Sequence, residues 1–304
     1  MNTTPSPTPA RSAPPVTPPA VPELHPSAGR VQHHLEILRH ELALYSVLVR
    51  ARMRAQWQYR SSFLIMTAVT FIGLLGELLA IVLLLHRFDT IAGWTLGEIA
   101  LLYALASISF GMAEMIGAGF DLFPQVIRRG EFDQVLLRPV SIFTQTLASD
   151  FQLRRLGRIA QGSVALAISM QAGVIDWTLA RVLYLPLVLG SGMLLFLALL
   201  VCGATLCFWT VESAQMINVF TNGGVELATY PLPIYHVALQ RFFTFVVPTA
   251  FVSYVPALFL LGRLEGSGWP IWSAFAPPLT AAAFTMAAVA FWRVGVRHYR
   301  STGS

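Results

Sequence analysis

The sequence contains no lysine, and all 20 of its Lys-plus-Arg positions hold arginine. A phosphate-binding loop of the GxxxxGKS/T type needs a lysine, so this chain cannot supply one. Charged residues are also scarce, at 12% of the chain, about half of the share typical of soluble proteins. Hydrophobic residues make up 55% and the mean hydropathy is +0.63. This composition excludes soluble enzymes and nucleic-acid-binding proteins, and it indicates a polytopic membrane protein with an all-α fold.

Signatures of catalytic and metal sites are missing as well. The two cysteines, Cys202 and Cys207, lie in an apolar run and do not form a CxxC pair, so we expect them to be packing residues. Neither HExxH nor GxSxG occurs. His33, Glu36 and His40 have a spacing that suits a metal, but a solvated helix face explains them equally well. We therefore predict no catalytic residue, no cofactor and no metal site.

Three regions differ in composition. Residues 1–30 are rich in proline, serine and threonine, which predicts a disordered tail. Residues 31–60 carry leucines at three- and four-residue steps and then arginines with Trp57 and Tyr59, which is typical of an amphipathic helix on the cytosolic membrane surface. Residues 61–304 hold the apolar runs and form the predicted membrane domain.

Six apolar runs are long enough to cross a bilayer, which predicts six transmembrane helices. They lie near Phe63–Leu85, Leu96–Phe120, Ile159–Ile175, Val182–Trp209, Phe242–Leu261 and Ala274–Trp292. With a cytosolic N-terminus, the predicted outside loops keep only Arg87, Arg181 and Arg263, whereas the inside segments hold the other arginines of the membrane domain. This positive-inside bias predicts that both termini are cytosolic.

A cytosolic loop of about 121–158 follows the second run. Its segment Arg128-Arg-Gly-Glu-Phe-Asp133, with Leu136, Arg138 and Pro139 after it, mixes both charge signs with apolar side chains. We expect a short amphipathic helix that ends at Arg138-Pro139, with Phe132 as an apolar anchor and charges at the rim. The alternatives are a docking helix for a cytosolic partner and an interfacial helix without a partner.

This segment resembles the coupling loop of the six-helix permeases of type-2 ATP-binding-cassette (ABC) exporters. Tyr230-Pro-Leu-Pro-Ile-Tyr235, the stretch from Pro248 to Gly262 and the ending Gly295–Ser304 agree with it, and the resemblance runs from about residue 30 to the end. It implies a half-transporter that pairs with a second permease copy or a paralogue and with a separate ABC ATPase. ATP and magnesium would then bind that ATPase. The residues that the resemblance assigns to ATPase coupling are Arg128, Arg129, Gly130, Glu131, Phe132, Asp133, Leu136, Arg138 and Pro139.

Two carboxylates and two prolines lie within the apolar runs. Glu77 and Glu114 would be costly at membrane depth, so each faces either a substrate or cation path, or a neighbouring helix as a protonated hydrogen-bond donor. Pro248 and Pro256 interrupt the fifth run and predict kinks, serving either as a hinge or as a static bend.

The sequence thus predicts the permease subunit of an ATP-driven exporter in a bacterial cell (inner) membrane. Its expected contacts are an ABC ATPase, a second permease and membrane lipid, without nucleic acid. A hydrophobic or cationic compound is the expected cargo. A stand-alone ion-coupled transporter or channel, motivated by Glu77 and Glu114, is the alternative, and an intramembrane enzyme is a weaker third.

Overall fold

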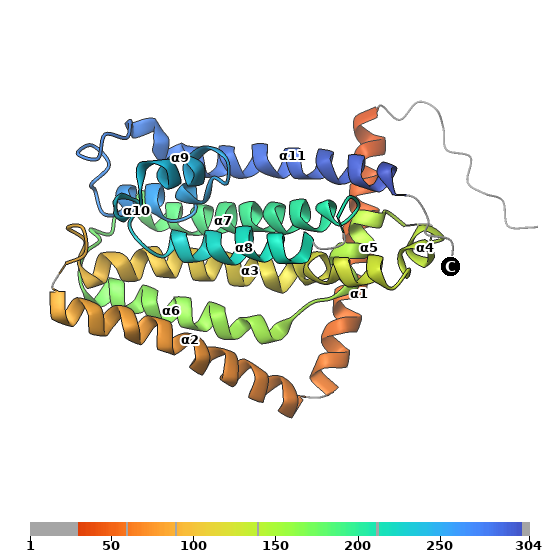
Figure 1. The fold of residues 1–304 in the computed structure, drawn as a ribbon, viewed down its shortest axis with the longest axis horizontal. Coiled ribbons are helices and arrows are strands. Elements are labelled where there is room, and N and C mark those ends of the chain that lie inside the picture. Colours follow the sequence, from red (N-terminus) through yellow and green to blue (C-terminus); the bar gives the residue numbers. More distant parts are fainter. Residues whose placement is uncertain (1–29, 59, 89, 139, 211–212, 300–304) are drawn as a thin grey trace, which may run out of the picture. The chain divides into compact units, whose positions relative to one another are not determined.

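The computed structural model describes residues 30–58, 60–88, 90–138, 140–210 and 213–299, and this part of the chain is helical apart from its turns (Figure 1). Residues 1–40 form one unit, of which only the start of the first helix is described, and residues 41–304 form a second unit, to which everything below refers. The α-helices are α1 (Arg30–Gln58), α2 (Arg60–Phe88), α3 (Leu96–Arg128), α4 (Phe132–Leu136), α5 (Ile142–Ser149), α6 (Leu156–Gln171), α7 (Leu179–Leu206), α8 (Ser213–Ala228), α9 (Val237–Phe245), α10 (Tyr254–Leu260) and α11 (Ala276–His298). Short 3-10 helices are η1 (Leu153–Arg155), η2 (Leu232–Ile234), η3 (Thr249–Phe251) and η4 (Ile271–Phe275).

Helix α3 is the centre of the bundle. It begins at a capping box, in which the backbone N–H of Thr95 donates to Glu98 Oε2 at 2.8 Å. Most of its length is buried, and it contacts α5, α6, α7 and α8. A Cβ on Gly162 of α6 would lie 2.7 Å from Ile108 Cγ1 of α3, so only glycine allows the two helices to approach this closely.

Within the described residues, three helical segments are long and apolar enough to span a membrane, namely α3, α7 and Ile271–His298. The number rises to five if two bent helix pairs, Tyr45–Gln58 with Ser61–Glu77 and Val237–Phe245 with Thr249–Leu260, each count as one span. The predicted third span falls on α6, which is short for a span at 16 residues. The all-α fold is therefore confirmed, whereas the count of six and the side of the termini remain predictions.

The predicted fifth span, Phe242–Leu261, is not one continuous helix. It covers only the end of α9 and then η3 and α10, and the segments Val237–Phe245 and Thr249–Leu260 are bent by 74° to each other. Leu232 before α9 and Leu264 after α10 both pack in one apolar cluster with Trp94, so the chain returns to the end of the bundle from which it came. Along the chain, α8 comes between α7 and this pair, and it contacts both α3 and α7 (Figure 1).

The predicted surface helix of residues 31–60 coincides with the helix α1. Its location at a membrane surface stays a prediction. The predicted disordered tail falls on residues 1–29, outside the described residues, and so also stays a prediction.

Candidate coupling and pathway sites

The predicted coupling loop is largely helical. Helix α3 continues through Arg128, and a tight turn then leads into α4. Gly130 has φ +68°, a left-handed conformation that favours glycine, and the backbone N–H of Glu131 donates to Val126 O at 3.1 Å. The expected single amphipathic helix is therefore wrong, because this turn splits the segment in two. Pro139 lies outside the described residues.

Phe132 is the first residue of α4, and its side chain is fully buried at 0% exposure. Its ring centroid lies 5.5 Å from that of Phe123 on α3, 5.5 Å from that of Phe208 after α7 and 4.7 Å from that of Tyr299 after α11. Trp292 of α11 completes the group, 5.0 Å from Phe123 and 5.7 Å from Phe208. We call these five rings, Phe123, Phe132, Phe208, Trp292 and Tyr299, the aromatic hub. The hub joins α4 to the ends of three helices.

The expectation that Phe132 is an exposed docking anchor is therefore wrong. A large apolar ring in a charged segment gains more by packing on other rings than by facing water. Asp133 also turns inward, since its Oδ1 accepts a hydrogen bond of 3.1 Å from the Tyr299 hydroxyl. Burial and the neighbouring Asp133 carboxylate raise the pKa of Tyr299 above its usual value, which keeps the hydroxyl protonated as the donor.

The outer side of this segment carries two leucines among charges. Leu136 is 43% exposed and Leu137 is 86% exposed. Arg129 and Glu131 are exposed and 3.8 Å apart at their closest N and O atoms. Together with exposed Arg138 these residues form what we call the α4 edge: Arg129, Glu131, Leu136, Leu137 and Arg138. Arg128 is exposed beside it at the end of α3.

Leu137 was missed by sequence reasoning. The signal was the pair of consecutive leucines just before Arg138, since only one of two neighbouring side chains can face inward on a short helix. The structure leaves both leucines exposed, Leu137 more than Leu136.

Glu114 lies on α3 and is closed off by arginines. Its carboxylate oxygens lie 3.0 Å from Arg155 Nη1 and 3.7 Å from Arg158 Nε, and the residue is only 9% exposed. The Arg158 guanidinium also stacks over the Phe110 ring at 5.0 Å. An ion-paired Glu114 joins α3 to the start of α6, which is neither of the two roles expected from the sequence, an open pathway carboxylate or a protonated donor.

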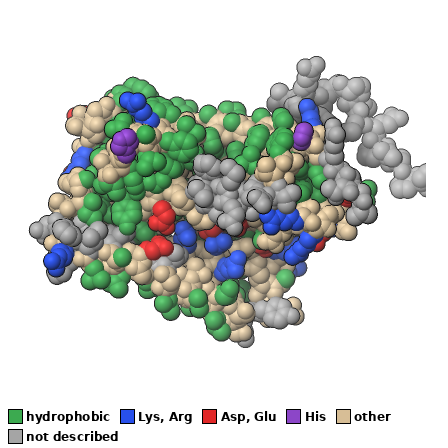
Figure 2. Space-filling model, viewed as in Figure 1, with side chains coloured by type: hydrophobic (Ala, Val, Ile, Leu, Met, Phe, Trp, Pro, Cys, Tyr) green, Lys and Arg blue, Asp and Glu red, His purple; other side chains and the backbone are tan. Residues whose placement is uncertain are grey.

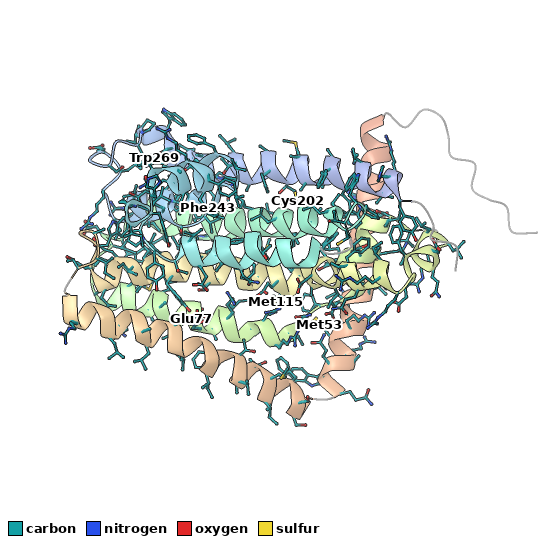
Figure 3. All side chains as sticks on the ribbon, viewed as in Figure 1. Met53, Glu77, Met115, Cys202, Phe243 and Trp269 are labelled. Carbon is teal, nitrogen blue, oxygen red and sulfur yellow. The ribbon has the colours of Figure 1, made fainter. Side chains whose placement is uncertain are left out.

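Glu77 on α2 has a different environment. Its side chain is exposed, and its Oε2 accepts a hydrogen bond of 3.1 Å from the Tyr103 hydroxyl of α3 (Figure 3). Gln161 of α6 donates in turn to the Tyr103 hydroxyl oxygen. Glu226 of α8, also exposed, is close enough to Glu77 for the two charges to interact. Sequence reasoning did not assign this group to a site, although its members are polar residues in otherwise apolar helices. They are Tyr103, Gln161 and Glu226.

Pro248 and Pro256 differ in whether they bend a helix. Pro248 lies between α9 and η3, at the bend of this helix pair, as expected of a kink. Pro256 is the third residue of α10, where a helix has no partner for the backbone N–H in any case. The expected kink at Pro256 is therefore wrong.

No group of three potential metal ligands gathers among the described residues. The side chains of His33, Glu36 and His40 lie outside them.

The sequence matches the family described as ABC-2 family transporter protein over residues 71–303. The chain belongs to this family. No curated protein and no solved structure matches the chain.

Membership in the ABC-2 family confirms the resemblance seen in the sequence. The chain is a multi-pass membrane component of an ABC-2 type transporter, and such membrane subunits do not themselves hydrolyse ATP. The family also implies an ABC ATPase as partner. The matched region contains the α4 edge, the aromatic hub and both carboxylates.

Proposed function

We propose that this ABC-2 protein is the permease subunit of an ATP-driven exporter in a bacterial cell membrane. It works with a second permease, a copy or a paralogue, and with separate ABC ATPase subunits that bind ATP and magnesium. The observation that carries the proposal is the exposed α4 edge in a chain of this family, since an apolar pair ringed by charges has the chemistry of a small docking surface.

In this mechanism the ATPase seats on the α4 edge and moves it when ATP closes the ATPase dimer. The aromatic hub supports the next step, because Phe132 packs on rings from the ends of α3, α7 and α11. Packed cores switch between discrete arrangements and do not deform continuously, so a shift of α4 is passed to all three helices.

The proposed topology has six passes with both termini cytosolic. The passes are α2, α3, α6, α7, α8 and α11, with α8 in place of the segment Phe242–Leu261. The pair α9–α10 enters and leaves at the outer side, which is supported by the shared cluster of Leu232, Leu264 and Trp94. Arginines of the inner end include Arg128, Arg138 and Arg155, as the positive-inside rule requires. Arg241, which the sequence pattern assigned to the cytosol, then belongs to the outer side.

The face between α2 and α8 is the proposed dimer and pathway face. Figure 2 shows acidic side chains and arginines gathered across the middle of the visible face, with further basic side chains toward its two ends. Glu77 and Glu226 both open onto this face. Carboxylates at membrane depth face a bundle interior or water and not lipid, so a second permease covers this face and encloses a water-filled path. Two carboxylates favour a cationic cargo.

Co-purification with the tagged chain tests the assembly, followed by transport in sealed vesicles. We expect an ABC ATPase to co-purify, and cargo movement to need ATP hydrolysis. If no ATPase associates and movement instead follows a proton or sodium gradient, the ion-coupled alternative replaces this proposal.

A further inference from the structure

A cavity of about 580 Å³ lies where α1, α2 and the segment before α6 meet. Its volume falls within the range of about 300–1,000 Å³ that small-molecule sites occupy. The wall comes from the last turns of α1, the first turns of α2, Leu122 of α3 and the segment Asp150–Arg154. The lining residues are Arg52, Ala55, Gln56, Ser62, Phe63, Met66, Leu122, Asp150, Gln152 and Arg154.

The cavity has a cationic part and an apolar part. Arg52 and Arg154 supply two guanidinium groups, which suit the geometry of a phosphate. The wall also holds one carboxylate, Asp150, whose Oδ2 accepts a hydrogen bond of 2.8 Å from Gln152 Nε2, so two cationic groups face one anionic group and the wall is net positive. Phe63 and Met66 line the other part with apolar side chains. A ligand that fits both parts carries an anionic head and an apolar body.

The sequence around the cavity belongs to a membrane interface. Arginines alternate along the end of α1, and Trp57 beside them is 65% exposed. Phe63 and Met66 are among the first residues of the apolar run of α2. Arginine next to exposed tryptophan at the start of an apolar run is the pattern of the headgroup level of a bilayer. The cavity therefore opens at the depth where phospholipid headgroups lie.

We propose that this cavity binds one anionic phospholipid, with its phosphate held by Arg52 and Arg154 and its acyl chains along Phe63 and Met66. A free phosphate has no use for the apolar part, and a zwitterionic lipid has no net charge for the two arginines. Anionic lipids of the cytosolic leaflet are drawn to basic side chains near the membrane, with about a fivefold gain in binding for each.

The bound lipid would act on the joint between α1 and α6. On the α1 side, Gln56 connects α1 to the segment before α6. Its amide group donates to Phe151 O, and its Oε1 accepts from the Leu153 N–H at 3.2 Å. On the α6 side, Gln152 Oε1 accepts from Arg154 Nε at 3.1 Å and from Arg155 Nε at 3.2 Å. A phosphate bound to Arg154 would compete with Gln152 Oε1 for the Arg154 guanidinium. The same oxygen accepts from Arg155, which is the ion-pair partner of Glu114.

The test measures lipid retention by native mass spectrometry on the purified full chain. The probes are phosphatidylglycerol, phosphatidylcholine with the same acyl chains, and inorganic phosphate. The variants are Arg52→Gln, Arg154→Gln and the double change. Arg293→Gln on α11 is the matched control, because it removes an exposed arginine far along the chain from the cavity. Ser62→Trp fills the cavity mouth and keeps both arginines, so it remains informative if the double variant does not fold.

We expect the parent and Arg293→Gln to retain phosphatidylglycerol in preference to phosphatidylcholine. Retention should fall about fivefold in each single variant and more in the double variant, and Ser62→Trp should lose it as well. Equal retention by the parent and these variants would overturn the proposal, as would equal binding of phosphatidylcholine. Retention of inorganic phosphate by the parent, lost in the arginine variants to the same extent as the lipid, would also overturn it, because the cavity would then be a plain anion site. None of these readouts involves the ATPase, so they are independent of the proposed docking.

Discussion

Two regions of the bundle differ in how their carboxylates are placed. Toward the α4 end, Glu114 is enclosed by Arg155 and Arg158, and the aromatic hub locks α4 to its neighbours. On the face between α2 and α8, Glu77 and Glu226 are exposed, and neither has a salt bridge within the described residues, although Glu98 beside Trp94 is paired with Arg263 at 2.7 Å. The arrangement around Glu114 neutralises charge and stiffens the bundle, whereas the face between α2 and α8 leaves charge open.

This difference suits a transporter that is moved from one end. The α4 end needs rigid connections, because a soft joint would absorb the motion of a docked ATPase. The other half needs unpaired polar groups, because a pathway must offer groups to the cargo. A carboxylate in an apolar run can thus hold two helices together through ion pairs, as Glu114 does, or offer an open charge to a cargo, as we propose for Glu77. The flanking sequence does not distinguish these two roles.

The largest effect is expected in a labelling experiment that compares the two ends. With Cys202 and Cys207 replaced by alanine, Pro233→Cys should react fully with a membrane-impermeant maleimide added outside cells. Leu137→Cys should react only after the membrane is opened. The reason is that Pro233 lies in η2, next to Leu232 of the cluster at the Trp94 end. Protection of Pro233→Cys in intact cells would contradict α8 as the fifth pass.

Replacing Glu114 should strongly destabilise the bundle. Glu114→Gln leaves Arg155 and Arg158 without their counter-charge in a partly buried site, at a cost of about 3–5 kcal/mol in the free energy of unfolding. Arg155→Gln on top of it should recover part of the loss, because one uncompensated charge is removed. Thermal unfolding in detergent measures both. A Glu114→Gln protein as stable as the parent would show that the ion cluster does not hold α3 to α6.

A milder loss is expected in the aromatic hub. Phe132→Leu keeps most of the buried apolar volume and removes the ring contacts to Phe123, Phe208 and Tyr299. Each such ring pair contributes about 0.5–1.5 kcal/mol, so losing three should lower the free energy of unfolding by about 1.5–4.5 kcal/mol. ATP hydrolysis should continue while cargo movement falls. Normal transport at reduced stability would make the hub a packing feature only.

The smallest effect on stability is expected at the open carboxylate. Glu77→Gln keeps an oxygen that accepts from the Tyr103 hydroxyl, so the cost should be at most about 1 kcal/mol. Transport of a cationic cargo should nevertheless fall, because the charge is lost. The same measurement on Glu226→Gln is the companion test. Unchanged transport by both variants across a pH series would remove this face from the pathway.

The composition and the long apolar runs predicted the all-α membrane fold, because both reflect local hydropathy. Which side of a short helix faces inward depends on the neighbours that tertiary packing brings up. Phe132 is therefore buried where an exposed anchor was expected, and Leu137, for which nothing was expected, is exposed. The run Phe242–Leu261 is apolar enough for a span, yet hydropathy does not record that the chain turns back after Phe245. The partners of Glu114 follow it along the sequence by some 40 positions, on a helix that only the fold brings alongside.

The central claim is that the α4 edge docks the ATPase, and a binding measurement tests it most directly. The parent, the double variant Leu136→Ala/Leu137→Ala and the buried control Phe132→Leu would each be titrated with the ABC ATPase that co-purifies with the parent. Truncating both exposed leucines should weaken binding by about 2 kcal/mol, which is near 30-fold, while the fold remains as stable as the parent. Phe132→Leu should bind nearly as well as the parent, since its ring does not reach the surface. Undiminished binding by the leucine double variant would contradict the account.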